Sequence, residues 1–269
     1  LDDCRRAPAF CFLALDEPVR HCHDRNKDCL CSHDRLKSLL ATRFLRYSGI
    51  GNSPAAQAPP AGYNKMETLL YWIGLAAVAV FALTGVLDAG RKNMDLIGAV
   101  MVGTATALGG GTVRDVLLQR PVFWLGEPVY LYVALATTLA VFFVVRGLRQ
   151  PLRLFLVPDA VGLALFTIVG TQIALEWHAP WLAASLLGVI TGIVGGVVRD
   201  VLCNEVPLVF MRGELYASAA WMGSLVLIGL QALGVSAVVA AWAGMATILI
   251  LRLTAMAFRI TLPTYTARK

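Results

Sequence analysis

GGGTVRDVL, at residues 109–117, is repeated 85 residues later as VGGVVRDVL at residues 194–202, and seven of the nine positions are identical. Each copy places an arginine and an aspartate directly after a run of glycines, inside a long apolar segment: Arg114 with Asp115, and Arg199 with Asp200. Ionised side chains in such a segment are costly and by default indicate a functional site. The stretch therefore predicts a duplicated membrane unit built around a polar centre.

The composition agrees with a membrane protein. The chain is 58% hydrophobic and only 15% charged, with a mean hydropathy of +0.68, whereas soluble domains carry roughly a quarter charged residues. Apolar stretches of about 17 to 25 residues recur, as bilayer-spanning helices require. They do not alternate between apolar and polar residues as barrel strands do. We therefore predict an all-α membrane protein.

The apolar segments divide into seven transmembrane helices after Met66. The breaks between them contain charge, proline or glycine, which interrupt helices. The predicted spans are 68–87, 96–118, 129–145, 160–175, 181–203, 215–233 and 238–258.

The 85-residue offset extends beyond the motif. Phe81 aligns with Phe166, and Thr106 with Thr191, so spans one to three correspond to spans four to six. Because each unit has an odd number of spans, its two copies must cross the membrane in opposite directions. This predicts an inverted 3+3 repeat, an architecture that recurs in transporters. A seventh helix rich in alanine and glycine follows, which suits close helix packing.

The predicted domains are a first repeat at 66–150, a second at 151–235, the seventh helix at 236–258 and a cytoplasmic tail at 259–269. Residues 1–65 differ from the rest, because they hold five of the six cysteines. Their spacing does not match a zinc site, and no signal peptide is recognisable. We expect a poorly structured, dispensable extension, as an upstream region translated in error would produce.

The basic residues predict the orientation. Short loops rich in Lys and Arg stay in the cytoplasm. If residues 1–65 are set aside, one side receives Lys65, Arg120 and little else. The C-terminus is therefore predicted to be cytoplasmic and the start of the first span outside. The basic residues assigned to the cytoplasmic side are Arg91, Lys92, Arg146, Arg149, Arg153, Arg212, Arg252, Arg259, Arg268 and Lys269.

Glycine runs interrupt the second and fifth spans. Consecutive glycines favour a kink or unwinding, and broken backbone at membrane depth is tolerated where protein or water meets its polar groups. We predict that these helices break there and line a pore; the alternative is that the glycines only permit tight packing. The glycines are Gly109, Gly110, Gly111, Gly195 and Gly196.

The four motif charges are the predicted pore charges. Because neighbours on a helix point about 100° apart, we expect crosswise pairing, Arg114 with Asp200 and Arg199 with Asp115. The alternative is that both pairs lie at the membrane surface and bind anionic lipid headgroups. Asp159, after Pro158, is most simply an N-cap of the fourth span, with a pore role as the alternative.

Four ordered motifs resemble a known family. These motifs, together with the span count, resemble the prokaryotic trimeric intracellular cation (TRIC) channels, also described as proteins with paired glycine-transporter domains. The resemblance covers roughly residues 66–258. The motifs are GGGTVRDVL, VGGVVRDVLCNEVP, PDAVGLALFTIVGT at 158–171 and ELYA at 214–217.

The resemblance implies a homotrimer in a bacterial inner membrane, with an hourglass pore in each protomer that passes monovalent cations, chiefly potassium. The pore would be lined by the two glycine-containing helices and their Arg–Asp pairs. Arginines in a cation pore must be offset by carboxylates and carbonyls, or must act as gates.

Two other functions remain open from the residues: a carrier for glycine or another small zwitterion, and a non-conducting lipid-binding protein. An enzyme is not expected, because no nucleophile–base pair, metal set or nucleotide-binding loop is present. We accordingly predict no catalytic residue, cofactor, metal or nucleic-acid partner.

Overall fold

The computed structural model describes residues 65–146, 152–211 and 215–258, and for Lys65 and residues 152–154 only the backbone. The predicted extension, the cytoplasmic tail and parts of two loops lie outside these ranges. The helices in them are α2 (Lys65–Arg91), α3 (Leu96–Leu117), α4 (Phe123–Gly126), α5 (Val129–Val145), α6 (Leu152–Glu176), α7 (Trp181–Leu202), the 3-10 helix η1 (Leu208–Phe210), α8 (Ala217–Ala232) and α9 (Ala237–Phe258).

All seven predicted spans coincide with helices, and the structure adds the two short helices α4 and η1. Within the described ranges, five helices are long and apolar enough to cross a membrane: α2, α3, α6, α7 and α9. Helices α5 and α8 are apolar but have only 17 and 16 residues. The described part is thus an all-helical membrane protein in which five spans meet both criteria.

The duplication extends to the backbone. In each unit the first two long helices are joined by a turn with one residue in the left-handed region, Asn93 (φ 53°) and His178 (φ 56°). A second such residue follows each Arg–Asp motif, Gln119 (φ 52°) and Asn204 (φ 55°). Both pairs are 85 residues apart, so the two units share their turn geometry as well as their sequence.

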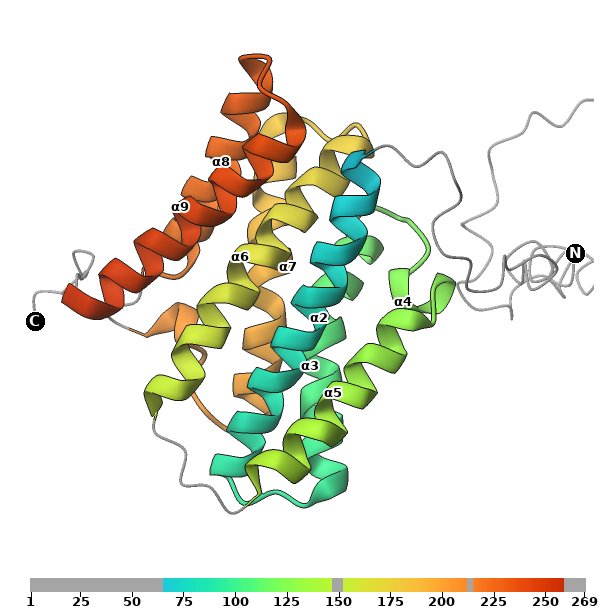
Figure 1. Ribbon diagram of the computed structural model, residues 1–269, viewed down its shortest axis with the longest axis vertical. Coiled ribbons are helices and arrows are strands. Elements are labelled where there is room, and N and C mark those ends of the chain that lie inside the picture. The colour runs from blue at the N-terminus through green and yellow to red at the C-terminus, as the bar shows by residue number, and fades with distance from the viewer. Residues whose placement is uncertain (1–64, 147–151, 212–214, 259–269) are drawn as a thin grey trace, which may run out of the picture. The chain divides into compact units, whose positions relative to one another are not determined.

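The two units are inverted relative to each other. In Figure 1, α2 runs downward beside an upward α6, and α3 runs upward beside a downward α7. Equivalent residues meet at the junction, because the rings of Phe81 and Phe166 lie 5.0 Å apart. A contact between equivalent positions is what a two-fold axis produces, here a pseudo-two-fold axis between α2 and α6.

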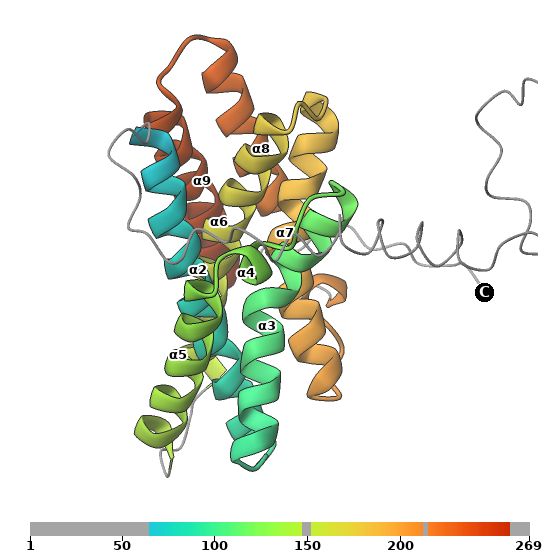
Figure 2. The same ribbon diagram turned by 90° about the vertical axis from the view of Figure 1, so that its right-hand side faces the viewer.

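Helices α3 and α7 lie side by side in both views (Figures 1 and 2) and cross reciprocally at their glycines. A Cβ atom on Gly195 would lie 2.6 Å from the backbone oxygen of Thr106, and one on Gly110 would collide with the backbone oxygen of Thr191. These glycines therefore allow two helix backbones to touch.

The predicted helix breaks are not confirmed. Helix α3 continues without interruption through Gly109, Gly110 and Gly111, and α7 through Gly195 and Gly196. The backbone approach at the crossing supplies another reason for the glycines, since any side chain would separate the helices. The close-packing alternative accounts for what is observed.

Helix α9, outside the duplication, packs on α8 and α6. Its small residues Ala240, Ala241 and Gly244 are buried there, as the composition of the seventh span predicts. A Cβ atom on Gly244 would lie 2.9 Å from the backbone oxygen of Gly223 in α8. Helix α9 therefore approaches the second repeat closely, which matters for the charge that it carries inward.

Candidate functional site

The first motif forms a closed charge pair at the end of α3. The Nε and Nη2 atoms of Arg114 both contact Oδ1 of Asp115, at 2.8 Å each. The other carboxylate oxygen of Asp115 accepts a hydrogen bond from the backbone N–H of Phe123, at 2.8 Å. The aspartate thus binds its neighbouring arginine and the start of α4.

The second motif repeats this arrangement. Arg199 contacts Oδ1 of Asp200 through Nε at 2.9 Å and Nη2 at 2.8 Å. Oδ2 of Asp200 accepts the backbone N–H of Leu208 at 2.9 Å. Phe123 and Leu208 are themselves 85 residues apart, so the pair and its loop anchor were duplicated together.

The predicted crosswise pairing is therefore wrong. Each described arginine of the two motifs is paired with the aspartate next to it. The arginine side chain is long and flexible enough to reach this neighbour, although the two Cβ atoms point about 100° apart on the helix. The lipid-headgroup alternative also fails, since Arg114 is 2% exposed and Arg199 fully buried. A surface site for anionic lipid would leave these groups at the membrane interface.

Arg199 has a second partner that Arg114 lacks. Its Nη1 atom donates to Oδ1 of Asp159 at 2.7 Å, and both side chains are fully buried. Asp159 lies inside α6, seven residues after its first residue, so the N-cap interpretation is wrong. Asp159, which the sequence indicated only weakly as a pore residue, is thus a direct partner of the second motif.

Arg252 of α9 completes this cluster. Its Nη2 atom lies 3.9 Å from Oδ2 of Asp159, and its guanidinium stacks 4.5 Å from the ring centre of Tyr216. Assigning Arg252 to a cytoplasmic loop was wrong, because it is fully buried. Its place within an apolar span was the signal that could have identified it, by the same reasoning that singled out Arg114. A charge inside a span needs a buried partner.

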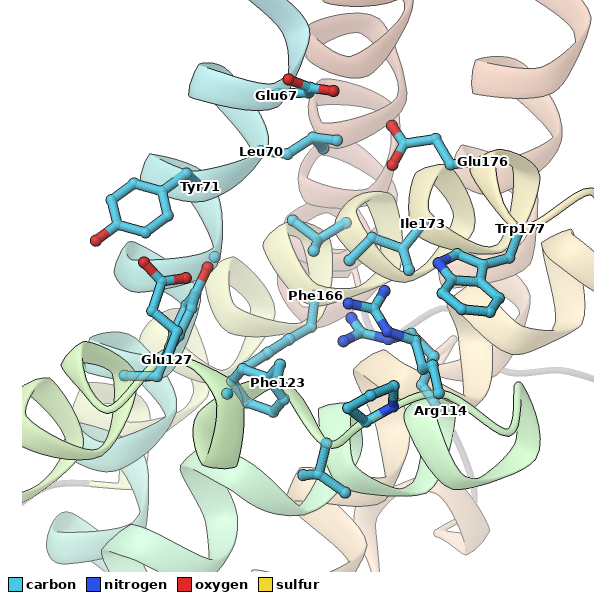
Figure 3. A pocket seen from close by; sticks show the side chains of 17 residues that line it. Glu67, Leu70, Tyr71, Arg114, Phe123, Glu127, Phe166, Ile173, Glu176 and Trp177 are labelled. Carbon is cyan, nitrogen blue, oxygen red and sulfur yellow. The ribbon is translucent and has the colours of Figure 1, made fainter. Parts of the chain in front are cut away.

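The two repeats differ most at this point. The residue equivalent to Asp159 in the first repeat is Gly74, so Arg114 has no second carboxylate partner at that position. A cavity of about 450 Å³ occupies that region (Figure 3), lined by Arg114 and Gly74 among others. One motif therefore faces a cavity, whereas its counterpart is closed by Asp159, Arg252 and Tyr216.

Charged residues surround this cavity. Glu67 of α2, Glu127 after α4 and Glu176 at the end of α6 line it (Figure 3), together with Arg120. The Arg120 guanidinium lies 5.5 Å from the ring centre of Trp177. The cavity is thus formed by the ends of helices from both repeats.

An ion-pair network lies at the other end of the repeats. Lys92 in the turn after α2 pairs with Glu205 after α7 at 2.9 Å, and Arg91 lies 3.8 Å from Glu205. Arg91 also pairs with the buried Asp88 at 2.9 Å. The hydrogen bond from Lys92 lowers the pKa of the Glu205 carboxyl. These contacts tie the α2–α3 turn of one repeat to the post-motif loop of the other.

In the described ranges, no group of three or more His, Cys, Asp or Glu side chains could hold a metal ion. The cysteine-rich residues 1–65, for which no zinc site is predicted, fall almost entirely outside these ranges.

Known proteins resemble this chain over both repeats. The family model described as "Glycine transporter" matches twice, at residues 71–146 and 156–232. The UPF0126 inner membrane protein YadS of Escherichia coli is 41% identical over 200 residues, which cover 73% of this chain and 96% of that protein. A UPF0126 membrane protein of Vibrio cholerae is also 41% identical, over 75% of this chain and 85% of the relative.

Solved structures give the same assignment. The TRIC trimeric intracellular cation channel orthologue from Rhodobacter sphaeroides aligns with a TM-score of 0.68 and 36% identity, covering 71% of this chain and 98% of that one. A prokaryotic TRIC channel crystallised in 0.5 M KCl aligns with a TM-score of 0.67 and 28% identity, covering 73% and 100%. With two matches to the family model and this shared fold, the chain belongs to the TRIC channel family, whose sequence model is named for a glycine transporter.

Proposed function

We propose that this protein is a potassium-permeable cation channel that works as a homotrimer with one pore in each protomer. The observation that carries the proposal is the pair of buried Arg–Asp motifs placed symmetrically about the α3–α7 crossing. Close packing of a helical core does not require two buried guanidinium groups, which are costly within a membrane segment. A water-filled path beside the crossing gives both motifs a role.

The proposed path begins at the cavity beside Arg114, passes the glycines of α3 and α7, and ends beside Arg199. Along it the pore residues are the five glycines and the four motif charges predicted from the sequence. Each arginine is neutralised by its own aspartate at 2.8–2.9 Å. This local pairing removes most of the repulsion that two guanidinium groups would exert on a passing cation.

Asp159 and Arg199 form the proposed closed gate. A buried carboxylate held between Arg199 and Arg252 blocks the second half of the path, whereas glycine stands at the equivalent position of the first half. Opening requires Asp159 to release Arg199. Arginine side chains that close a pore in this way act as a gate, with the carboxylate setting the energy of closure.

Related solved structures are those of TRIC cation channels, which supports cation conduction here. Potassium selectivity, the trimer and the orientation with a cytoplasmic C-terminus are parts of the proposal that rest on the family resemblance and on the loop charges. The related Escherichia coli protein is named as an inner membrane protein, which supports the same location here.

Flux through proteoliposomes that contain the full chain tests the proposal. Outward potassium gradients are expected to drive a cation current at single-channel rates, and Asp159→Asn is expected to raise the fraction of open time. Saturable glycine uptake without current would favour a carrier instead, and the absence of both would reject transport. Glu205→Gln, a charge change away from the contact between Asp159 and Arg199, is the matched control for open time.

A further inference from the structure

The two ends of the proposed pore carry opposite charges at equivalent positions. Glu176 corresponds to Arg91, and Arg120 corresponds to Glu205, each pair being 85 residues apart. Glu127 corresponds in sequence to Arg212, which lies outside the described residues. Because the repeats are inverted, Glu176 and Arg120 lie at the cavity mouth, and Arg91 and Glu205 lie at the other.

At the cavity mouth the acids face one shared space. Glu67, Glu127 and Glu176 line the cavity of about 450 Å³ with Arg114 and Arg120 (Figure 3). Counting Asp115, which pairs with Arg114, four carboxylates face two guanidinium groups, a formal charge of −2. The three glutamates come from three separate elements, so no single local motif explains why they meet at the cavity.

At the opposite mouth the two basic and two acidic side chains described below balance each other. Arg91 and Lys92 meet Glu205 and the buried Asp88 in direct ion pairs of 2.9–3.8 Å. Asp88 and Glu205 are therefore both held in ion pairs. The three glutamates around the cavity line it, and Glu176 accepts a hydrogen bond from the neutral side chain of Gln172 at 3.4 Å, so their negative charge acts on a cation that enters.

Membrane topology explains only half of this pattern. The rule that keeps Lys and Arg in the cytoplasm accounts for Arg91 and Lys92, but Asp and Glu contribute little to orientation. The three cavity glutamates therefore need a reason of their own. Charged walls of one sign in a concave site raise the local concentration of the opposite ion.

We infer that Glu67, Glu127 and Glu176 form a cation-concentrating vestibule that makes conduction asymmetric. Potassium entering through the cavity mouth is enriched before it reaches Arg114, whereas potassium entering from the opposite mouth, where the charges balance, is not. The channel therefore rectifies at low salt, and the larger current is the one in which potassium enters the pore through the cavity mouth. This inference rests on the proposed channel function.

Single-channel recordings of the full chain in symmetrical KCl test it. The ratio of the larger to the smaller current at equal and opposite voltages is measured for each channel, which requires no knowledge of its orientation in the bilayer. At low ionic strength the ratio is expected to reach roughly twofold or more, below the tenfold and greater enrichment that focused fields can produce. At about 1 M salt the Debye length shrinks to about 3 Å, and the ratio is expected to approach one.

The triple variant Glu67→Gln, Glu127→Gln, Glu176→Gln removes the vestibule charge with little change of shape. Its ratio at low salt is expected to fall to about one, while currents at high salt stay those of the unmodified chain. Asp95→Asn is the matched control. Asp95 caps α3 by accepting the N–H of Gly98 at 2.8 Å and does not line the cavity, and asparagine also caps helices well. Its ratio should not fall.

The outcomes separate this inference from the function on which it rests. No cation current at any salt concentration would overturn the channel itself. A current that rectifies equally in the triple variant, or one that rectifies as strongly at high salt, would overturn only the vestibule. Retention of the variant as a folded species in size-exclusion chromatography excludes misfolding as the cause of a lost ratio.

Discussion

At the scale of single residues, the glycines of the α3–α7 crossing make the sharpest stability prediction. Gly110→Ala places a Cβ atom against the backbone oxygen of Thr191, which cannot move aside like the end of a side chain. We expect a loss of about 1–3 kcal/mol, as overpacking costs, measured as a lower thermal midpoint in detergent.

Gly109→Ala is the matched control for that substitution. Its Cβ atom would lie 3.6 Å from the nearest atom, Cγ2 of Val198, an ordinary contact. Since alanine is favoured over glycine within a helix by up to about 1 kcal/mol, the thermal midpoint should stay unchanged or rise. Equal losses in the two neighbouring variants would show that the crossing is not close-packed.

The buried pair of Arg199 and Asp159 makes a second prediction at this scale. Removing one partner leaves the other charge buried and uncompensated, which costs about 3–5 kcal/mol. Arg199→Gln and Asp159→Asn should each destabilise the protein. The double variant should lose less than the sum, with a coupling of about 0.5–3 kcal/mol, measured as a double-mutant cycle of unfolding in detergent.

Additive losses would show that the 2.7 Å contact between Arg199 and Asp159 contributes nothing to stability in detergent. A cycle between Asp159 and Arg114, which the structure does not pair, is the control and should be additive within about 0.5 kcal/mol.

These residues also show where sequence reasoning ends. It identified all four motif charges but paired them wrongly, because helix periodicity gives the direction of a Cβ atom and not the path of a long side chain. Arg252 was missed because it was counted as a loop charge. Its contact with Asp159 joins positions 93 residues apart, which a single sequence cannot bring together.

At the scale of elements, Glu205 connects the α2–α3 turn to the loop after α7 through Lys92. The ion pair lowers the pKa of Glu205 from its ordinary value of 4.5. A lowered folded-state pKa gives stability that is present above 4.5 and is lost as the pH falls through the lowered value. Because both side chains are about one-third exposed, the effect should stay below about 1 kcal/mol.

The measurement is the thermal midpoint between pH 7 and pH 4 for the full chain and for Glu205→Gln. The variant should be less stable at neutral pH, and the difference should shrink on acidification below 4.5. A difference that persists at low pH would mean that the glutamine disturbs packing and that the charge is not responsible.

The elements were the most predictable level of the structure. Helix positions follow from the length of apolar runs and from the charge, proline and glycine between them, all of which are local. The expected breaks in α3 and α7 were not confirmed, because consecutive glycines permit either a kink or a close helix contact. Only the partner helix decides between these, and Thr106 and Thr191 of the opposing helices provide the close contact.

At the scale of the whole molecule, inversion makes a topological prediction that differs from that of a parallel repeat. The turns at Asn93 and His178 are equivalent in sequence and backbone geometry, yet opposite crossing places them on opposite membrane faces. The loop charges predict that Asn93 lies in the cytoplasm with the C-terminus. A short epitope inserted after either residue, both of which are exposed, reports its side by antibody access to intact spheroplasts. We expect antibody binding for the His178 insertion and none for the Asn93 insertion until the membrane is opened.

Antibody access at both sites or at neither would contradict the inverted repeat. The reverse pattern would preserve the inversion but would place the proposed vestibule on the cytoplasmic side.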